Sequence, residues 1–278
     1  MTNLHMRPSR VLKKLRAGQV ASCIKINTTC PRVTDLAAML GFDCVWLDME
    51  HVPNDWSVIE HQIGSAKIHD VDTMVRVARG SYSDYIKPLE LDAAGIMVPH
   101  VMSLEDARKV VWQTRFHPVG RRPVDGGNAD GAYCLVDFNE YLETANRERF
   151  VIVQIEDPEP LDDLDAIAKL PGIDVIFFGP ADFSHGIGAP GRWDDPRLSD
   201  TRRRIAQVCR ANGKIAGTVG GTANLQELVD LGYRFISVGA DVVGLAEYFR
   251  QIAQAFGQIR VVQAGKLFTT KRTKGTKE

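Results

Sequence analysis

The stretches VIVQIE (residues 151–156) and VIFFGPAD (residues 175–182) decide the fold, because each is an apolar run that leads to an acid. Continuous apolar runs of this length are typical of parallel strands that are buried on both faces. Ligands of parallel α/β proteins gather at the carboxyl ends of the strands, so we expect Glu156 and Asp182 to converge on one open place. Two carboxylates on rigid supports suit a hard divalent cation such as Mg²⁺ or Mn²⁺. The alternative is that one acid caps a helix and the other forms a surface ion pair.

Eight runs of β type recur along the chain, and helical patterns that end in glycine or proline separate most of them. Eight strands that alternate with helices in about 250 residues are typical of one barrel domain. We therefore predict an α/β fold, a single-domain (β/α)8 TIM barrel, in preference to a doubly wound open sheet. The runs cover residues 20–25, 44–47, 73–77, 95–98, 151–155, 175–178, 214–217 and 235–238.

The expected domain organisation has three parts. Residues 1–16 are predicted to be an N-terminal extension, residues 17–262 the barrel and residues 263–278 a basic tail. The tail is rich in Lys, Thr and Gly and is predicted to be disordered, with contact to a membrane or nucleic acid as a minor alternative. Residues 117–146 form a connection too long for a plain crossover, and we predict a lid, a subunit contact or a passive surface excursion.

The composition excludes several classes of protein. The 278 residues are 44% hydrophobic and carry a formal net charge of -1, so the main body has no electrostatic signature of nucleic-acid binding. A small, acidic metabolite is the expected partner. Five cysteines without a C-x-x-C pair argue against a disulfide framework and a thiolate metal site. Because we find neither a secretory signal nor an apolar run long enough to span a membrane, we expect a soluble, cytoplasmic protein.

Other reactive side chains follow the predicted strands. His51 comes three residues after Asp48, and an acid that orients a histidine makes a general base near neutral pH, although such a histidine is often only a satisfied hydrogen-bond partner. Arg76 offers a fixed guanidinium to a carboxylate or a developing enolate oxygen, with a rim salt bridge as the alternative. Gln154 belongs to the same predicted strand ends, and Glu50 is expected to hold the loop or a water.

The chain contains, in this order, the motifs LDMEH (residues 47–51), PND (53–55), VP (98–99), QIE (154–156), GPADFS (179–184) and VGAD (238–241). Together these motifs resemble those of the HpcH/HpaI aldolases, which are class II, metal-dependent pyruvate aldolases. The family includes 4-hydroxy-2-oxo-heptanedioate and 2-keto-3-deoxy-sugar-acid aldolases. The resemblance runs from about Val20 to Phe249, and the acid–histidine block and the Gly-Pro-Ala-Asp block together make it specific.

The resemblance implies an assembly and a metal site. The assembly is a hexamer, either a trimer of dimers or a dimer of trimers, with the last helix exchanged or packed on a neighbouring subunit. The metal is Mg²⁺ or Mn²⁺, with Co²⁺ also possible, and it is bound by Glu156 and Asp182. Pyruvate is expected to chelate this metal through its carboxylate and keto oxygens.

The resemblance also implies roles for the other site residues. Arg76 steadies the enolate oxygen, and His51, held by Asp48, moves protons to and from the substrate hydroxyl. Gln154 orients the bound acid, and the backbone near Ala181 receives its carboxylate. The expected function is a carbon–carbon lyase that cleaves or forms a 4-hydroxy-2-oxo acid from pyruvate and an aldehyde through a metal-bound enolate.

Departures and alternatives keep the substrate open. Glu90 stands where the family often has aspartate, and the loop after Gly120 differs from the family's, which leaves the aldehyde undefined. A citramalyl- or malyl-CoA lyase is the first alternative, although only Arg121 and Arg122 offer a basic groove for CoA phosphates. A non-catalytic metabolite-binding barrel is the second. A Schiff-base mechanism is weaker, because only Lys25 comes close to a suitable lysine.

Overall fold

The computed structural model describes residues 4–259, 262–263 and 266–267. The chain forms two compact units, Met1–Asp241 and Val242–Glu278. The first unit therefore ends before residue 262, where the sequence analysis placed the end of the barrel. The disorder predicted for the tail concerns mainly residues 264–265 and 268–278, which lie outside the described residues. Within the described ranges, every helix falls short of the length and apolar character that a membrane span needs.

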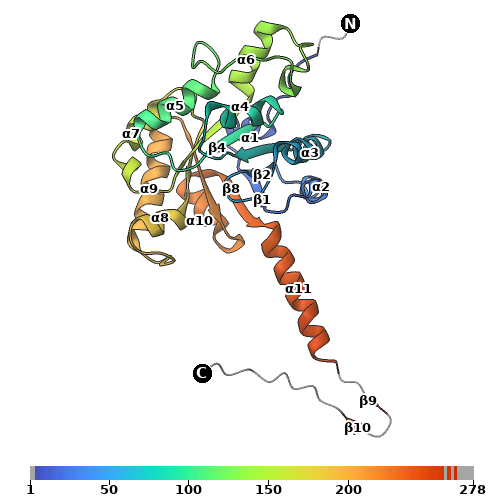
Figure 1. The fold of residues 1–278 in the computed structure, drawn as a ribbon. Helices are drawn as coiled ribbons and strands as arrows, with labels where there is room; N and C mark the ends of the chain where they lie inside the picture. The colour runs from blue at the N-terminus through green and yellow to red at the C-terminus, as the bar shows by residue number, and fades with distance from the viewer. Residues whose placement is uncertain (1–3, 260–261, 264–265, 268–278) are drawn as a thin grey trace. The chain divides into compact units, whose positions relative to one another are not determined.

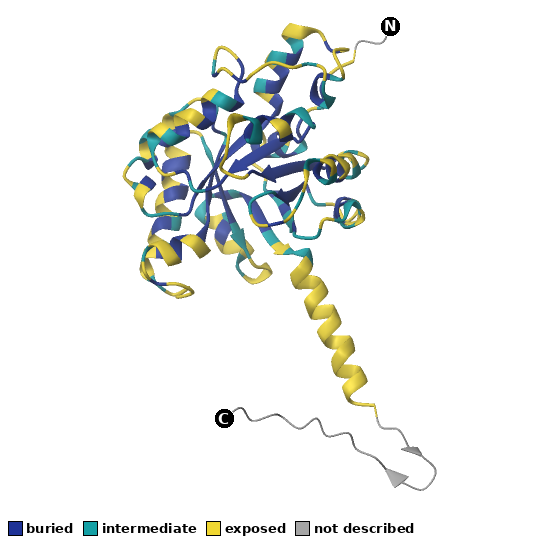
Figure 2. Cartoon of the chain, viewed as in Figure 1, coloured by how far each residue is buried: buried dark blue, intermediate teal, exposed yellow. Residues whose placement is uncertain are grey.

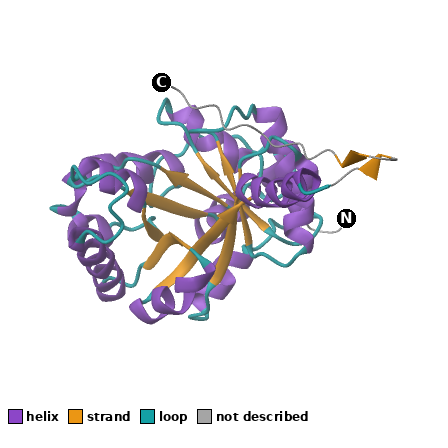
Figure 3. Cartoon of the chain, turned by 90° about the horizontal axis from the view of Figure 1, so that it is seen from below, coloured by secondary structure: helices purple, strands orange, loops and turns teal. Residues whose placement is uncertain are grey.

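Eight parallel strands close into a barrel in chain order, with β8 paired to β1 (Figures 1 and 3). The predicted (β/α)8 fold is thereby confirmed. Parallel pairing brings the carboxyl ends of all eight strands to one end of the barrel. The strands are β1 (Ala21–Ile26), β2 (Cys44–Asp48), β3 (Asp72–Arg76), β4 (Gly95–Val98), β5 (Phe150–Ile155), β6 (Val175–Phe178), β7 (Ile215–Gly220) and β8 (Tyr233–Ala240).

Helices between successive strands cover the outside of the barrel, with their buried faces toward the strands (Figure 2). Because one face of each helix is apolar, this packing buries a cluster of Val, Ile and Leu between the helices and the strands. This cluster is separate from the one inside the barrel. The helices are α2 (Pro31–Met39), α3 (Trp56–Lys67), α4 (Tyr82–Glu90), α5 (Leu104–Thr114), α7 (Leu164–Lys169), α8 (Pro180–Gly186), α9 (Pro196–Ala211) and α10 (Leu225–Leu231). The helix α6 (Phe138–Glu148) differs, because it belongs to the long connection before β5 and packs into a separate apolar cluster through Tyr141 and Ala145.

Side chains fill the interior of the barrel. The Trp46 and Phe177 ring centroids lie 5.8 Å apart, and those of Phe177 and Phe235 lie 6.3 Å apart. Gly95 leaves room for Phe150, since a Cβ at that glycine would come within 2.2 Å of the ring. The polar side chains at the carboxyl ends of the strands therefore lie next to this apolar interior.

The helix α1 (Arg10–Arg16) packs into the same inner cluster through Val11, Leu12 and Leu15. The sequence predicts an extension outside the barrel for residues 1–16. The three apolar residues lie on one face of the helix, and the basic residues around them made the segment look polar. The helix therefore completes the core at the N-terminal ends of the strands.

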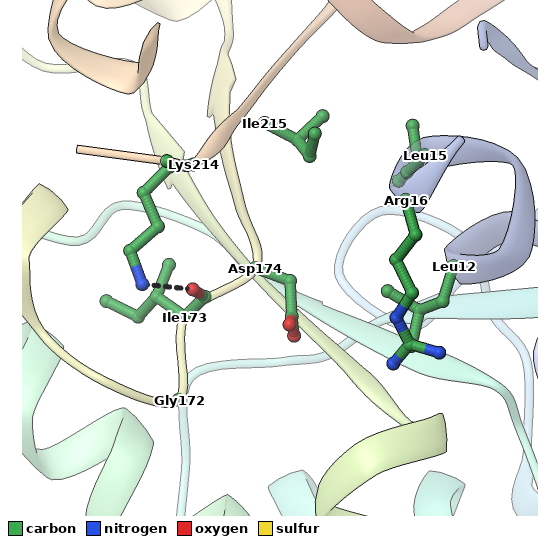
Figure 4. Close-up of a pocket in the computed structure, with 9 residues that line it drawn as sticks. Leu12, Leu15, Arg16, Gly172, Ile173, Asp174, Lys214 and Ile215 are labelled. Atoms are coloured by element: carbon green, nitrogen blue, oxygen red, sulfur yellow. Dashed lines mark hydrogen bonds between the residues drawn. The ribbon is translucent and has the colours of Figure 1, made fainter. Parts of the chain in front are cut away.

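A pocket of about 350 Å³ lies beside α1, at the start of β6 and β7 (Figure 4). Lys214 Nζ donates to the carbonyl oxygens of Leu170 and Ile173, both at 2.7 Å. Burial lowers the pKa of Lys214, against the opposing charge of Asp174. Because residues that precede two strands line the pocket, it lies at the end of the barrel opposite to Glu156.

The long connection before β5 also lies at the N-terminal end of the barrel. Arg115, where it begins, donates to the carbonyl oxygens of Gly172 at 2.8 Å and Arg149 at 2.6 Å, close to the starts of β6 and β5. Within the loop, the buried carboxylate of Asp130 accepts hydrogen bonds from Arg122 and Tyr141, both at 2.8 Å. A lid over the acids of its own barrel is therefore wrong. A subunit contact and a passive excursion stay predictions.

The carboxylate of Asp72 fastens the N-terminal segment to the barrel, and we predict that its loss destabilises the fold. This buried group accepts hydrogen bonds from Arg7 Nη2 at 2.6 Å, Ser9 Oγ at 2.6 Å and the N–H of Val11 at 2.9 Å. Asp72→Asn should lower the free energy of unfolding in urea by about 3 kcal/mol, because it leaves buried partners unpaired. Asp70→Asn removes the exposed partner of the same Arg7 and should cost less than about 1 kcal/mol. Equal losses in the two variants would count against this role.

Candidate active site

Side chains from several strands meet at the C-terminal end of the barrel. The register of β2 and β3 pairs Asp48 with Arg76, the last residue of each strand. Lys25 of β1 reaches the same place, because its Nζ lies 2.8 Å from Asp48 Oδ2. Glu156 follows β5 and is 1% exposed. These positions agree with the expectation that functional side chains gather at the carboxyl ends of the strands, which we call the strand-end rule.

Asp48 is held by two cations. Arg76 donates from Nε to Oδ1 at 3.1 Å and from Nη2 to Oδ2 at 2.6 Å, and the N–H of Glu50 donates to Oδ1 at 3.0 Å. Burial alone would raise the pKa of Asp48, but Arg76 and then Lys25 outweigh it and lower this pKa to about 2. The Trp46 ring lies 4.9 Å from Arg76 Cζ and 5.2 Å from Lys25 Nζ. Asp48, Arg76 and Lys25 thus form a fixed cluster beside the Trp46 ring, which we call the charge group.

The expected pairing of His51 with Asp48 is wrong. The Asp48 carboxylate is turned into the barrel and occupied by Arg76 and Lys25, while His51 lies beyond the end of the strand with 59% of its side chain exposed. The carboxylate near His51 is that of Glu50, with Nε2 and Oε2 3.5 Å apart. Glu50 Oε2 also lies 2.9 Å from Arg76 Nη1. Glu50 thus connects the histidine to the charge group.

Glu156 is a buried carboxyl group that, among the described residues, has no Lys or Arg as an ion-pair partner. Its Oε1 accepts a hydrogen bond from the N–H of His100 at 2.9 Å, and its Oε2 accepts one from Gln154 Nε2. Burial raises the pKa of Glu156 to about 7; the N–H and ring of His100 oppose this shift, and the charges of Asp182 and Glu50 add to it. The ionised form is therefore costly at neutral pH unless another positive charge approaches.

Gly179 leaves space for the Glu156 carboxylate, and Gln154 offers a hydrogen-bond acceptor beside it. A Cβ at Gly179 would lie 2.6 Å from Glu156 Oε2, so a side chain there would displace the carboxylate. Gln154 Oε1 is buried and accepts no hydrogen bond from the described residues. An unpaired buried acceptor is costly, so this oxygen is available to a ligand or a cation.

His100 is a site residue that the sequence analysis missed. Its backbone is left-handed, with φ of 47°, and its Nδ1 lies 2.8 Å from Asp157 Oδ2. Its Nε2 lies 3.8 Å from both Glu50 Oε1 and Glu156 Oε1. Burial lowers its pKa, but Asp157, Glu156 and Glu50 together raise it above the ordinary value. The strand-end rule could have found it, since His100 follows β4 after a single proline.

Asp182 is the third residue of α8 and is exposed, as is Ala181 before it. Among the described residues, no three His, Cys, Asp or Glu side chains are arranged as a metal-binding cluster. Two carboxylates that leave coordination positions for substrate and water are nevertheless what a hard cation such as Mg²⁺ accepts. The oxygen donors of Glu156 and Asp182 fit such a cation, and that they share one stays a prediction.

Comparisons with known proteins give the relatives of the chain and agree with its fold. The family model described as HpcH/HpaI aldolase/citrate lyase matches residues 25–247, a range that includes every side chain of the site. A 2-keto-3-deoxy-L-rhamnonate aldolase of Salmonella gallinarum is 30% identical over 257 residues, which cover 91% of this chain and 94% of that protein. The crystal structure of an HpcH/HpaI aldolase from Desulfitobacterium hafniense DCB-2 has a TM-score of 0.84 at 26% identity and covers 90% of this chain and 97% of that one. The citrate synthase SbnG has a TM-score of 0.81 at 27% identity, with 88% and 96% covered.

We predict that acid destabilises the fold, because it protonates Asp48 and breaks its ion pairs with Arg76 and Lys25. The pKa of Asp48 is lowered from 3.8 to about 2, so the stability that its ionised form contributes is present above about pH 4 and is lost as the pH falls through 2. We expect the difference in free energy of unfolding between the wild type and Asp48→Asn to shrink by about 2 kcal/mol over this range. Urea denaturation at a series of pH values measures it. A difference that does not change with pH would argue against an ionised, buried Asp48.

Proposed function

Because the chain belongs to the HpcH/HpaI aldolase/citrate lyase family and is a carbon–carbon lyase of the aldolase type, we propose that it cleaves or forms a 4-hydroxy-2-oxo acid from pyruvate and an aldehyde with a divalent cation. The observation that carries the proposal is the buried carboxyl group of Glu156, whose pKa is raised to about 7 by burial and by the charges of Asp182 and Glu50. A cluster of carboxylates around a buried acid at the end of an enzyme barrel is costly for the fold alone and is well suited to a cation.

The proposed cation site uses Glu156 and Asp182, with Mg²⁺ or Mn²⁺ as the expected ion and Co²⁺ as a further candidate. When bound, such an ion supplies Lewis-acid stabilisation of the charge on the substrate's keto oxygen, an effect worth several kcal/mol. Gln154 Oε1, which accepts no hydrogen bond from the described residues, would orient the bound 2-oxo acid. The backbone at Ala181, the second residue of α8, would receive the carboxylate of this acid.

Arg76 would stabilise the developing enolate oxygen. A guanidinium has five N–H donors, and the hydrogen bonds to Asp48 use two of them, while Nη1 forms an ion pair with Glu50 at 2.9 Å. At least two N–H groups therefore remain for substrate, and the two carboxylates fix the orientation of the guanidinium. Preorganised donors of this kind are worth the most where water is excluded, and Arg76 is 4% exposed.

His51 is proposed to move the proton of the substrate hydroxyl. Its exposed ring stands at the mouth of the barrel, and Glu50, 3.5 Å from Nε2, takes the orienting place that the sequence analysis gave to Asp48. A histidine base of this kind contributes about a hundredfold to ten-thousandfold in rate. Asp48 acts through Arg76, because its contacts fix the guanidinium.

A citramalyl- or malyl-CoA lyase is less well supported. The two arginines considered for CoA phosphates lie on the long loop at the opposite end of the barrel. Arg122 is buried and paired with Asp130, and Arg121 Cζ stacks 5.6 Å from the Trp112 ring. Since family membership favours an enzyme, the non-catalytic barrel is set aside. The aldehyde remains open, because the relatives include both a sugar-acid aldolase and a citrate synthase at similar identity.

We also propose the hexamer that the resemblance implies, and the second unit supports a contact between subunits. The helix α11 (Asp241–Gly257) carries exposed apolar side chains along its length, among them Val243, Tyr248, Phe249 and Phe256. Contiguous exposed apolar surface of this kind marks protein interfaces. We propose that α11 packs on a neighbouring subunit, and sedimentation of the full chain as a stable monomer would rule this out.

A cytoplasmic location is also proposed. All five cysteines are free thiols in the structure. Free thiols persist in a reducing compartment, whereas proteins of oxidising compartments often pair them. This observation supports the proposed location.

Loss of either proposed ligand should remove both the cation and the activity. We expect Glu156→Gln and Asp182→Asn each to weaken Mn²⁺ binding and to lower aldol turnover at least about a hundredfold. Mn²⁺ binding is measured by electron paramagnetic resonance, and turnover by pyruvate release from a 2-keto-3-deoxy sugar acid. Glu159→Gln, an exposed acid three residues after Glu156, is the matched control and should change neither. Full activity of the wild type in EDTA would refute the proposal.

A further inference from the structure

The ammonium group of Lys25 lies inside the site and is not explained by the roles above. Side chains two residues apart on a strand share a face, and Cys23 belongs to the inner cluster of the barrel, so Lys25 also points inward. Its side chain is 20% exposed, and its Nζ lies 2.8 Å from Asp48 Oδ2. The charge therefore stands at the open end of the barrel interior, where a ligand can reach it.

Lys25 has hydrogen-bond donors to spare. An ammonium carries three N–H donors, and among the described residues its ion-pair partner is Asp48 alone. Arg76 differs, since its Nε, Nη1 and Nη2 all face carboxylates of Asp48 and Glu50. Of the two cations, Lys25 thus has the larger share of its donors free for a ligand.

The order of the strands indicates which part of the substrate Lys25 faces. In a closed barrel of eight strands, β1 stands four strands from β5 in either direction, so the two are opposite each other. The proposed function places the 2-oxo acid at Glu156 and Asp182, which follow β5 and β6. Lys25 therefore lies across the mouth of the barrel from these two acids and beside Arg76, which contacts the same Asp48 oxygen. The aldehyde reacts with the enolate that Arg76 would stabilise, so we expect it on this side of the site.

Charge balance suggests what that aldehyde carries. Asp48 and Glu50 contribute two negative charges to this side of the site, and Lys25 and Arg76 contribute two positive ones. Without Lys25, Asp48 and Glu50 would share the guanidinium of Arg76 and would repel an anion more strongly. Lys25 offsets this repulsion and offers free N–H donors, which suits the carboxylate of an acidic acceptor.

We propose that Lys25 is a specificity-determining residue that binds the carboxylate of an acidic aldehyde. The inference rests on the proposed aldolase function. A purely structural Lys25, which only neutralises Asp48, would support reaction with charged and uncharged aldehydes alike. The two roles therefore differ in the ratio of activities and not in activity itself.

The test compares two acceptors of two carbons each, glyoxylate and glycolaldehyde, with pyruvate and Mn²⁺. We expect Lys25→Met to lower the ratio of kcat/KM for glyoxylate to that for glycolaldehyde at least tenfold, and Lys25→Arg to keep most of it. Lys14→Met is the matched control, because Lys14 Nζ lies 2.8 Å from the buried Asp43 at the opposite end of the barrel. This control should leave the ratio unchanged.

The outcomes separate this inference from the proposed function. An unchanged ratio in Lys25→Met, with both acceptors still used, overturns the inference alone. An equal fall for both acceptors shows a structural role and also overturns it. Wild-type protein that joins pyruvate to neither acceptor and does not exchange the methyl protons of pyruvate with deuterium oxide overturns the proposed function instead. If Lys25→Met fails to fold in a thermal unfolding assay, Lys25→Gln replaces it with the same expected ratio.

Discussion

Burial of the Glu156 carboxyl group at the mouth of a closed barrel is the constraint on which the site depends. A carboxylate removed from water is destabilised unless positive charge or several donors compensate it. Among the described residues, the N–H of His100, the amide of Gln154 and, at 3.8 Å, the His100 ring surround it. Gly179 keeps the space open. The fold thus maintains an acid that a divalent cation would stabilise.

Two carboxyl groups at the same end of the barrel have opposite pKa shifts because their surroundings differ. Asp48 is also buried, but Arg76 and Lys25 lower its pKa to about 2, whereas the pKa of Glu156 is raised to about 7. The first is ionised at neutral pH and fixes the guanidinium of Arg76. In the proposed function, the second loses its proton when a cation binds. Environments that shift the pKa values of two acids in opposite directions are common in catalytic sites.

Much of the barrel could be predicted from the sequence, because buried parallel strands are written as continuous apolar runs. The rule that ligands gather at the ends of these strands located Asp48, Arg76 and Glu156 correctly. It could not give the partners of each group. A spacing of three residues suggested that Asp48 orients His51, but the strand ends between them, so one side chain turns into the barrel and the other to solvent.

Other errors also have physical reasons. The position of His100 after β4 could have been predicted, but its contact with Glu156 could not, because that contact depends on a left-handed backbone that the sequence does not indicate. The apolar face of α1 is only three residues, Val11, Leu12 and Leu15, within a basic segment. The long connection before β5 looked like a possible lid, yet its place in the order of elements assigns it to the other end of the barrel. Topology decides such questions, and composition does not.

The number of protons released on Mn²⁺ binding tests the central claim most directly. Isothermal titration calorimetry in buffers of different ionisation enthalpy measures it. If Glu156 holds the cation, its pKa of about 7 predicts that binding at about pH 6 releases close to one proton and that the release fades above about pH 8. Mn²⁺ binding with no proton release at the lower pH would contradict the account.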